Sequence, residues 1–167
     1  MSKNKTLLLS SSDIKKKIER IAYEILENCD DESGIILAGI TGSGLKFAEK
    51  LSKQLKKFSE VNVKLCSITV NKSKPANQPV VCSISSEEFE SKTVIVVDDV
   101  AHTGRTVFYA MKVLMEVAPK KIQVAVLVDR KHKQFPIAAD YVGLLLSTNM
   151  QEHITVEFED EAAVYLS

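Results

Sequence analysis

The sequence has 167 residues, which is enough to bury a full hydrophobic core, and we predict a single domain over residues 1–167. Its 22 basic and 22 acidic side chains give a formal net charge of zero, so only a local basic patch could attract nucleic acid. No apolar run is long enough to cross a membrane, and three cysteines without metal-ligand or motif spacing favour a reducing cytoplasm.

The first predicted element is an amphipathic helix that follows Ser11 and Ser12. Its polar face carries three consecutive lysines, Lys15 to Lys17, which favour a solvated surface over a nucleic-acid site. A turn is expected over Asp30 to Gly34. The apolar face of the helix consists of Ile14, Ile18, Ile21, Ala22, Ile25 and Leu26.

A short run without polar residues, Ile35 to Ala38, is typical of a parallel strand that is covered on both faces. It leads into a glycine-rich loop, Gly39 to Gly44, whose backbone N–H groups could cradle phosphate oxygens. The same residues also suit a plain tight turn, since the spacing matches neither a Walker loop nor a dinucleotide-binding loop. The helix that follows presents Leu45, Ala48, Leu51 and Leu55 on one face.

Alternating apolar residues between Val61 and Val70 predict a half-buried strand. The polar segment from Asn71 to Gln78 then predicts a mobile loop, and Pro79 to Ile84 a further strand. Lys72 and Lys74 in this loop either meet an anionic substrate or only keep the loop soluble.

The segment with the most chemical content begins with Val94 to Val97, which again predicts a buried central strand. Asp98 and Asp99 follow at its carboxyl end, where open α/β sheets bind ligands. A turn over Asp98 to Gly104 leads into a helix that ends at Pro119. The predicted apolar stripe of that helix is Val107, Ala110, Met111, Leu114, Met115 and Ala118.

The turn over residues 103–106 reads Thr-Gly-Arg-Thr and places backbone N–H groups at a helix N-terminus, which favours an anion such as phosphate. Carboxylates accept hydrogen bonds but do not donate them. Asp98 and Asp99 therefore suit sugar hydroxyls, or waters around a divalent cation, better than phosphate. A phosphate next to a polyol describes a ribose 5-phosphate. The alternative reading, a pair of capping acids, is less favoured because it leaves two acids at the end of a buried strand without a ligand.

Strands are also predicted over Ile122 to Val128 and around Ile154 to Phe158. The segment Phe135 to Gly143 is expected to turn and begin a further strand, and Val164 to Leu166 to add an edge strand. Strands that alternate with helices predict an α/β fold with a central parallel sheet flanked by helices.

The segment Val94 to Thr106 resembles the phosphoribosyl pyrophosphate (PRPP) motif of the type I phosphoribosyltransferases, with an apolar strand, two acids, a spacer and Thr-Gly-x-Thr. The chain is also similar to one branch, the bacterial pyrimidine operon attenuator proteins that have uracil phosphoribosyltransferase activity. The similar segments are Ile14 to Leu26, Gly39 to Gly44, Val124 to Arg130 and Phe135 to Gly143. The resemblance implies the type I phosphoribosyltransferase fold, with a small C-terminal hood.

The resemblance also implies roles for residues. Asp98 and Asp99 would hold the ribose hydroxyls, and Asp129 and Val142 would lie near the base, beside a hood built from residues after Val128. Magnesium would arrive with PRPP, without a metal site of the protein itself. The expected PRPP-binding residues are Asp98, Asp99, Ala101, His102, Thr103, Gly104, Arg105 and Thr106, and the expected pyrophosphate loop is Ile40, Thr41, Gly42, Ser43 and Gly44.

Three positions differ from the attenuator branch. Thr41-Gly-Ser-Gly44 stands where that branch has Lys-Thr-Arg-Gly, and the region from Thr69 to Lys92 lacks a Tyr-Arg-Asp-Asp run. His102 replaces a common tyrosine. We expect Asp98, Asp99 and His102 to be the catalytic residues, but His102 could act as a general base, hydrogen-bond the base, donate to phosphate or be a passive turn residue. Asp129 stands where the 6-oxopurine branch has a lysine, which favours a pyrimidine.

Two function classes follow. The first is an enzyme that transfers ribose 5-phosphate from PRPP to a nucleobase, with uracil favoured, and yields a nucleoside monophosphate. The second is an RNA-binding regulator that keeps the site as a sensor of PRPP or nucleotide. RNA is the less favoured partner, because its only candidate surfaces are Lys15 to Lys17 and the trio Arg130, Lys131 and Lys133. By family analogy we also expect a homo-oligomer, a dimer or a tetramer.

Overall fold

The computed structural model describes residues 5–29, 33–147, 149 and 151–167. The turn expected over Asp30 to Gly34 lies partly outside them. The central sheet has six strands, and all are parallel except β4, which runs antiparallel to β3. In spatial order these strands are β4 (Val81–Cys82), β3 (Val63–Thr69), β2 (Ile35–Ile40), β5 (Thr93–Ala101), β6 (Lys121–Arg130) and β7 (Tyr141–Leu146).

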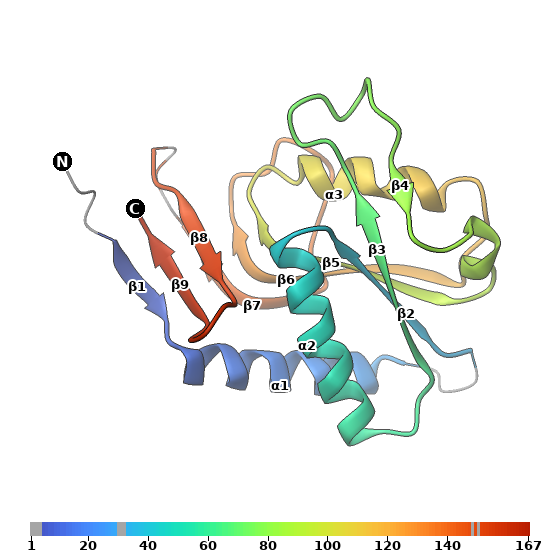
Figure 1. Ribbon diagram of the computed structural model, residues 1–167, viewed down its shortest axis with the longest axis horizontal. Coiled ribbons are helices and arrows are strands. Elements are labelled where there is room, and N and C mark those ends of the chain that lie inside the picture. The colour runs from blue at the N-terminus through green and yellow to red at the C-terminus, as the bar shows by residue number, and fades with distance from the viewer. Residues whose placement is uncertain (1–4, 30–32, 148, 150) are drawn as a thin grey trace.

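Helices cover both faces of this sheet (Figure 1). Helices α1 (Ser11–Glu27) and α2 (Ser43–Phe58) pack on one face, and each buries its predicted apolar stripe except Leu26 and Leu45, which are half-buried. Helix α1 begins two residues earlier than expected, because Ser10 forms a capping box with Asp13. The opposite face carries α3 (Arg105–Ala110) and the short 3₁₀ helices η1 (Ser86–Phe89) and η2 (Met111–Leu114).

The helix predicted from Val107 to Ala118 is wrong in its second half. The α-helix ends at Ala110 and continues as the 3₁₀ helix η2, in which side chains align every three residues. Val107 and Ala110 of α3 and Leu114 of η2 are buried. Met115 is rotated outward instead and is 70% exposed.

A second, three-stranded antiparallel sheet forms the hood and lies beside the carboxyl end of β5 (Figure 1). Its order is β1 (Thr6–Leu9), β9 (Ala163–Leu166) and β8 (Ile154–Glu157). Two of its strands come from the C-terminal part of the chain, as expected for the hood, and β1 joins them from the N-terminus. Sequence patterns did not predict β1, because four residues are too few to show a period.

Among the described residues no helix combines the length and the apolar character that a membrane span requires.

Candidate functional site

The paired acids lie within β5, which extends three residues beyond Asp98 to Ala101. The prediction that the strand ends at the acids is therefore wrong. Asp98 pairs in register with Val126 of β6, and its side chain is only 3% exposed, whereas Asp99 is half-buried. The Oδ1 atom of Asp98 accepts a hydrogen bond from the backbone N–H of Asp99 at 2.9 Å. This carboxyl is thus held rigidly at the floor of the site.

Burial raises the pKa of Asp98 well above its ordinary value, because a charge is costly to remove from water. The charge of Asp99 and a hydrogen bond between the two carboxyls raise the pKa of Asp98 further. Lys72 acts in the opposite direction and lowers it. The loop between β3 and β4 therefore brings one cation toward the acids, although the Lys72 side chain itself is exposed.

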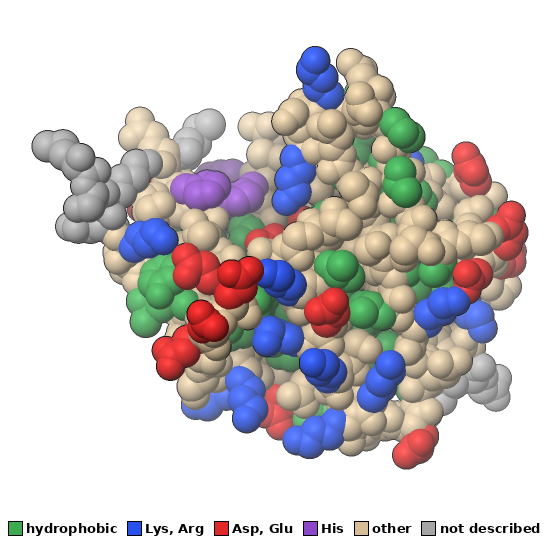
Figure 2. Space-filling model, in the orientation of Figure 1, with side chains coloured by type: hydrophobic (Ala, Val, Ile, Leu, Met, Phe, Trp, Pro, Cys, Tyr) green, Lys and Arg blue, Asp and Glu red, His purple; other side chains and the backbone are tan. Residues whose placement is uncertain are grey.

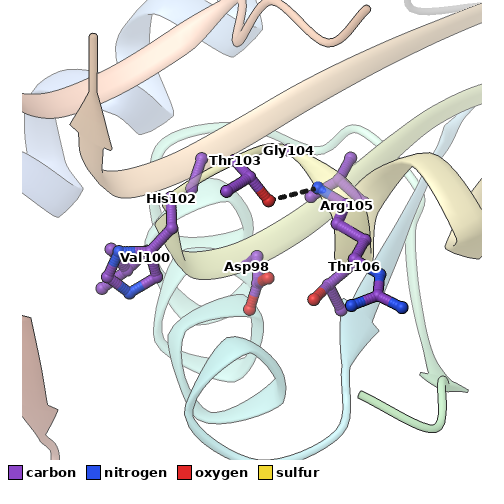
Figure 3. Close-up of a pocket in the computed structure, with 9 residues that line it drawn as sticks. Asp98, Val100, His102, Thr103, Gly104, Arg105 and Thr106 are labelled. Atoms are coloured by element: carbon purple, nitrogen blue, oxygen red, sulfur yellow. Dashed lines mark hydrogen bonds between the residues drawn. The ribbon is translucent and has the colours of Figure 1, made fainter. Parts of the chain in front are cut away.

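A small hollow opens beside these acids, over the turn between β5 and α3 (Figure 3). Gly104 adopts a left-handed backbone conformation with φ of +81°. A Cβ at that position would lie 3.0 Å from the Cβ of Ile137, so only glycine lets the turn close here. Thr103 Oγ1 accepts a hydrogen bond from the backbone N–H of Arg105 at 3.3 Å. The hollow is lined by Asp98, Val100, Ala101, His102, Thr103, Gly104, Arg105, Thr106 and Val107.

The glycine-rich loop after β2 lies directly against the acids. A Cβ on Gly44 would come within 2.8 Å of Asp98 Oδ1 and 3.1 Å of the Asp98 Cα. Gly42 has φ of +99° with open space around it. The structure thus brings Gly44, at the end of this loop, next to Asp98. Ile40 is different, because its side chain is fully buried in the core and leaves only its backbone for a ligand.

On the other side of the turn, Asp129 pairs in register with Ala101. Its carboxylate forms an ion pair with Lys133, whose Nζ also donates to the carbonyl of Ala101 at 3.4 Å. The sequence patterns did not identify Lys133 as a site residue. Its position four residues after Asp129 was the one feature that could have indicated an ion pair. Val142 does not line the hollow, since its side chain packs against the hydrophobic cluster that contains Ala101.

The ring of His102 lies where the hood adjoins the core. In Figure 3 it projects to the side of Asp98 that is opposite the Arg105 side chain. It stacks on His153, which precedes β8, with ring centroids 5.8 Å apart and planes inclined by 12°. Arg130 NH1 approaches the His102 Nδ1 atom at 3.0 Å. Burial, then the charges of Arg130 and His153, lower the pKa of His102. No sequence pattern places His153 here, because it belongs to a different sheet.

The site combines four chemical features. They are the hydrogen-bond acceptors of the acids, the turn around the hollow, whose backbone N–H groups suit a phosphate, the second glycine-rich loop, and the imidazole between the core and the hood. Among the described residues no group of three or more His, Cys, Asp or Glu side chains could hold a metal ion.

Comparisons with known proteins agree with this geometry. The family model of the phosphoribosyl transferase domain matches residues 6–161. A relative named bifunctional protein PyrR from Enterococcus faecalis is 38% identical over 153 residues, which cover 88% of this chain and 86% of the relative. Another of that name, from Pelotomaculum thermopropionicum, is 36% identical over 167 residues and covers 96% and 92%.

Solved structures show the same fold. A hypoxanthine-guanine phosphoribosyltransferase from Bacillus anthracis has a TM-score of 0.76 at 18% identity, over 97% of this chain and 99% of that one. A hypoxanthine phosphoribosyltransferase from Trypanosoma cruzi also has a TM-score of 0.76, at 19% identity, over 95% of each chain. The predicted fold class is confirmed. The chain therefore belongs to the type I phosphoribosyltransferases, in the branch that includes the bacterial bifunctional PyrR proteins.

Proposed function

We propose that this phosphoribosyltransferase transfers ribose 5-phosphate from PRPP to uracil and releases uridine monophosphate and pyrophosphate. The observation that carries the proposal is the direct contact between two phosphate-type loops and one acid pair. Gly44 packs against Asp98, and the turn at residues 101–106 opens from the same strand. One ligand with a 5-phosphate, a ribose and a pyrophosphate would span both loops.

In this proposal the carboxylates of Asp98 and Asp99 accept hydrogen bonds from the ribose 2- and 3-hydroxyls. The turn at residues 101–106 donates to the 5-phosphate, and the loop at residues 40–44 contacts the pyrophosphate through backbone N–H groups. Asp129 and His102 face the base. Magnesium, when bound, would neutralise charge on the pyrophosphate, and the carboxylates of Asp98 and Asp99 are acceptors that suit the waters around such a cation.

The reaction forms a bond between a base nitrogen and ribose C1 while the bond from C1 to the pyrophosphate oxygen breaks. The N–H proton of the base passes to solvent water, and the transition state has oxocarbenium character. The chain's own residues contribute by holding the two reactants in line and by stabilising the charge of the leaving group. His102 and Asp129, on the base side, are the groups that can orient the base.

Uracil is proposed over a purine because of Asp129, which is an acid where the 6-oxopurine branch has a lysine. Its ion pair with Lys133 makes this side of the site close to neutral. The structural neighbours that are named for hypoxanthine share under 25% identity with this chain and support the fold only.

The test is turnover by the purified full chain with magnesium and PRPP and one of six bases: uracil, hypoxanthine, guanine, adenine, xanthine or orotate. Pyrophosphate release is measured. We expect the highest kcat/KM with uracil. Turnover confined to a purine would overturn the choice of base, and binding of PRPP without turnover of any base would leave a sensor in place of an enzyme.

Lys72 provides a first prediction about this site. Replacing Lys72 by Met should lower kcat/KM for PRPP by about 5-fold, because charge pairs in contact with solvent contribute about 1 kcal/mol. The loss should shrink at high salt, where such pairs are screened. Lys74→Met, in the same exposed loop, is the matched control and should have a smaller effect. Equal losses in both variants would mean that Lys72 only adds to the general charge of the loop.

RNA binding is a second candidate function, supported by a basic groove between α1 and α2. Lys15, Lys50 and Lys53 line this groove, and none of the three is ion-paired within the described part of the chain. Figure 2 shows basic side chains gathered over these two helices. The trio after β6 is less suited to RNA, because Arg130 and Lys133 are held within the site.

Replacing all three groove lysines by Gln should weaken retention of RNA and reduce the slope of log K against log salt by about 2, since each phosphate contact releases close to one counterion. Binding is measured by filter retention of a uridine-rich single strand at several salt concentrations. Lys112→Gln, on the opposite face of the sheet, is the control for loss of a surface lysine outside the groove and should leave the slope nearly unchanged. An unchanged slope in the triple variant would exclude the groove as the RNA surface.

Three further properties complete the proposal. The chain acts as one domain over residues 1–167, works in the cytoplasm, and assembles as a homo-oligomer. The family match over residues 6–161 supports the first, and family analogy supports the other two.

A further inference from the structure

The contact between Arg130 and His102 determines the protonation state and the tautomer of the imidazole ring. Arg130 NH1 lies 3.0 Å from the His102 Nδ1 atom, and NH2 of the same guanidinium donates to the backbone carbonyl of Asn149 at 2.8 Å. A guanidinium carries only donors and stays protonated at every accessible pH. The ring nitrogen that faces it must therefore accept, which requires a neutral imidazole whose proton is on the other nitrogen, Nε2.

The surroundings of the ring support this state. The charged and titratable groups that face His102 are Arg130 from β6, His153 from the hood, Lys133 from the segment after β6, and Asp99 from its own strand. The first three lower the pKa of His102, as does its burial, and only Asp99 raises it. A protonated ring would place two cations at hydrogen-bond distance, so the neutral form is favoured.

The Nε2–H group also remains available. The rings of His102 and His153 are almost parallel, and an imidazole N–H lies in the plane of its ring, so neither ring donates to the other. Within the described residues, no hydrogen bond to Nε2 of His102 is recorded. In Figure 2 histidine side chains (purple) reach the surface near the hood.

We propose that Arg130 is a positioning residue that holds His102 as a neutral Nε2–H donor, and that His102 thereby selects nucleobases that present a carbonyl oxygen over those that present an amino group. Arg130 does not touch the base itself. The selection follows because an amino group would direct its own hydrogen toward the Nε2–H and leave both donors unsatisfied. This inference rests on the proposed function, since it assigns His102 to the base side.

The tautomer is tested first, without substrate, by the ¹⁵N shifts of the His102 ring in the labelled full chain. Wild-type protein should show a proton on Nε2 alone at neutral pH. Arg130→Met should give a mixture of tautomers and a higher His102 pKa, because one nearby charge is removed. Lys131→Met, which removes an exposed neighbouring charge, should change neither. A proton on Nδ1, or an unchanged tautomer in Arg130→Met, would overturn the role of Arg130.

Selection is then tested by calorimetric binding of nucleoside monophosphates, which requires no turnover. Uridine and inosine monophosphates present a carbonyl where cytidine and adenosine monophosphates present an amino group. Wild-type protein should prefer the carbonyl member of each pair by about 10- to 100-fold, the cost of an unsatisfied donor. His102→Leu should abolish that preference, and His102→Asn, which keeps an N–H donor, should restore part of it.

The outcomes separate the two claims. Equal binding of both members by wild-type protein would refute the selection by His102. Loss of preference in His102→Leu with no recovery in His102→Asn would reduce His102 to a structural role. Selective binding without pyrophosphate release would instead uphold the inference while overturning the proposed catalysis.

Discussion

Replacing Asp98 and Asp99 together by Asn is expected to lower kcat/KM for PRPP by about 100- to 10,000-fold. Each carboxylate in the proposed site accepts a hydrogen bond from a ribose hydroxyl, and hydrogen bonds to charged groups contribute about 1.5 to 3 kcal/mol each. A neutral amide accepts a weaker bond and turns a donor toward the same hydroxyl. The measurement is steady-state turnover together with direct binding of PRPP.

The fold should survive this change. Because burial and the neighbouring carboxyl raise the pKa of Asp98, its charged form destabilises the native state, and stability is lost as pH rises from the unfolded pKa toward the native one. An amide carries no charge, so the melting temperature of Asp98→Asn at neutral pH should equal or exceed that of the wild type. Asp160→Asn is the control, since Asp160 is exposed and Asn tolerates its positive φ of 47°. Retained PRPP affinity in the double variant would show that the ribose lies elsewhere.

The expected stability gain illustrates a conflict between folding and function. A carboxyl that is 3% exposed and faces a second acid is unfavourable for the empty protein. Lys72 offsets this only in part, because its side chain is exposed and its charge is screened by water. The arrangement makes sense for a site that is completed by a ligand with several hydroxyls.

The local parts of the site could be predicted from the sequence. Unbroken apolar runs predicted β2 and β5, because strands buried on both faces need no polar alternation. Glycines and threonines after those runs predicted the two loops. Parallel strands end at the same edge of a sheet, and since β2 and β5 are neighbours, Gly44 lies against Asp98 in the structure.

The parts that depend on distant contacts could not be predicted. His153 reaches His102 only because the hood folds back over β5, and strand β1 joins that hood from the other end of the chain. Lys133 was considered as a surface cation, since sequence spacing cannot tell a buried ion pair from a solvated one. These pairings depend on tertiary structure, and no local pattern of residues encodes them.

Gly44→Ala is the single substitution that we expect to impair the site most. The added Cβ would lie 2.8 Å from Asp98 Oδ1, 3.1 Å from the Asp98 Cα and 3.1 Å from the carbonyl oxygen of Val97. The strand is buried and cannot move freely, so the Asp98 carboxylate and the loop must separate. Overpacking of this kind costs about 1 to 3 kcal/mol of stability. Displacement of a substrate-positioning group by about 1 Å can cost 100-fold in rate, and we expect kcat/KM for PRPP to fall by about that factor.

A matched variant separates the effect on the site from the effect on the fold. Gly34→Ala places a Cβ 2.9 Å from the carbonyl oxygen of Asn62, at a positive φ of 74°, but at the opposite end of β2 from the acids. Both variants should therefore lose thermal stability, by about 2 to 4 °C for each kcal/mol in a chain of this size. Only Gly44→Ala should lose PRPP affinity, measured by calorimetry at a temperature where both remain folded. Similar affinities for the two variants would mean that the loop after β2 supports the sheet and does not bind pyrophosphate.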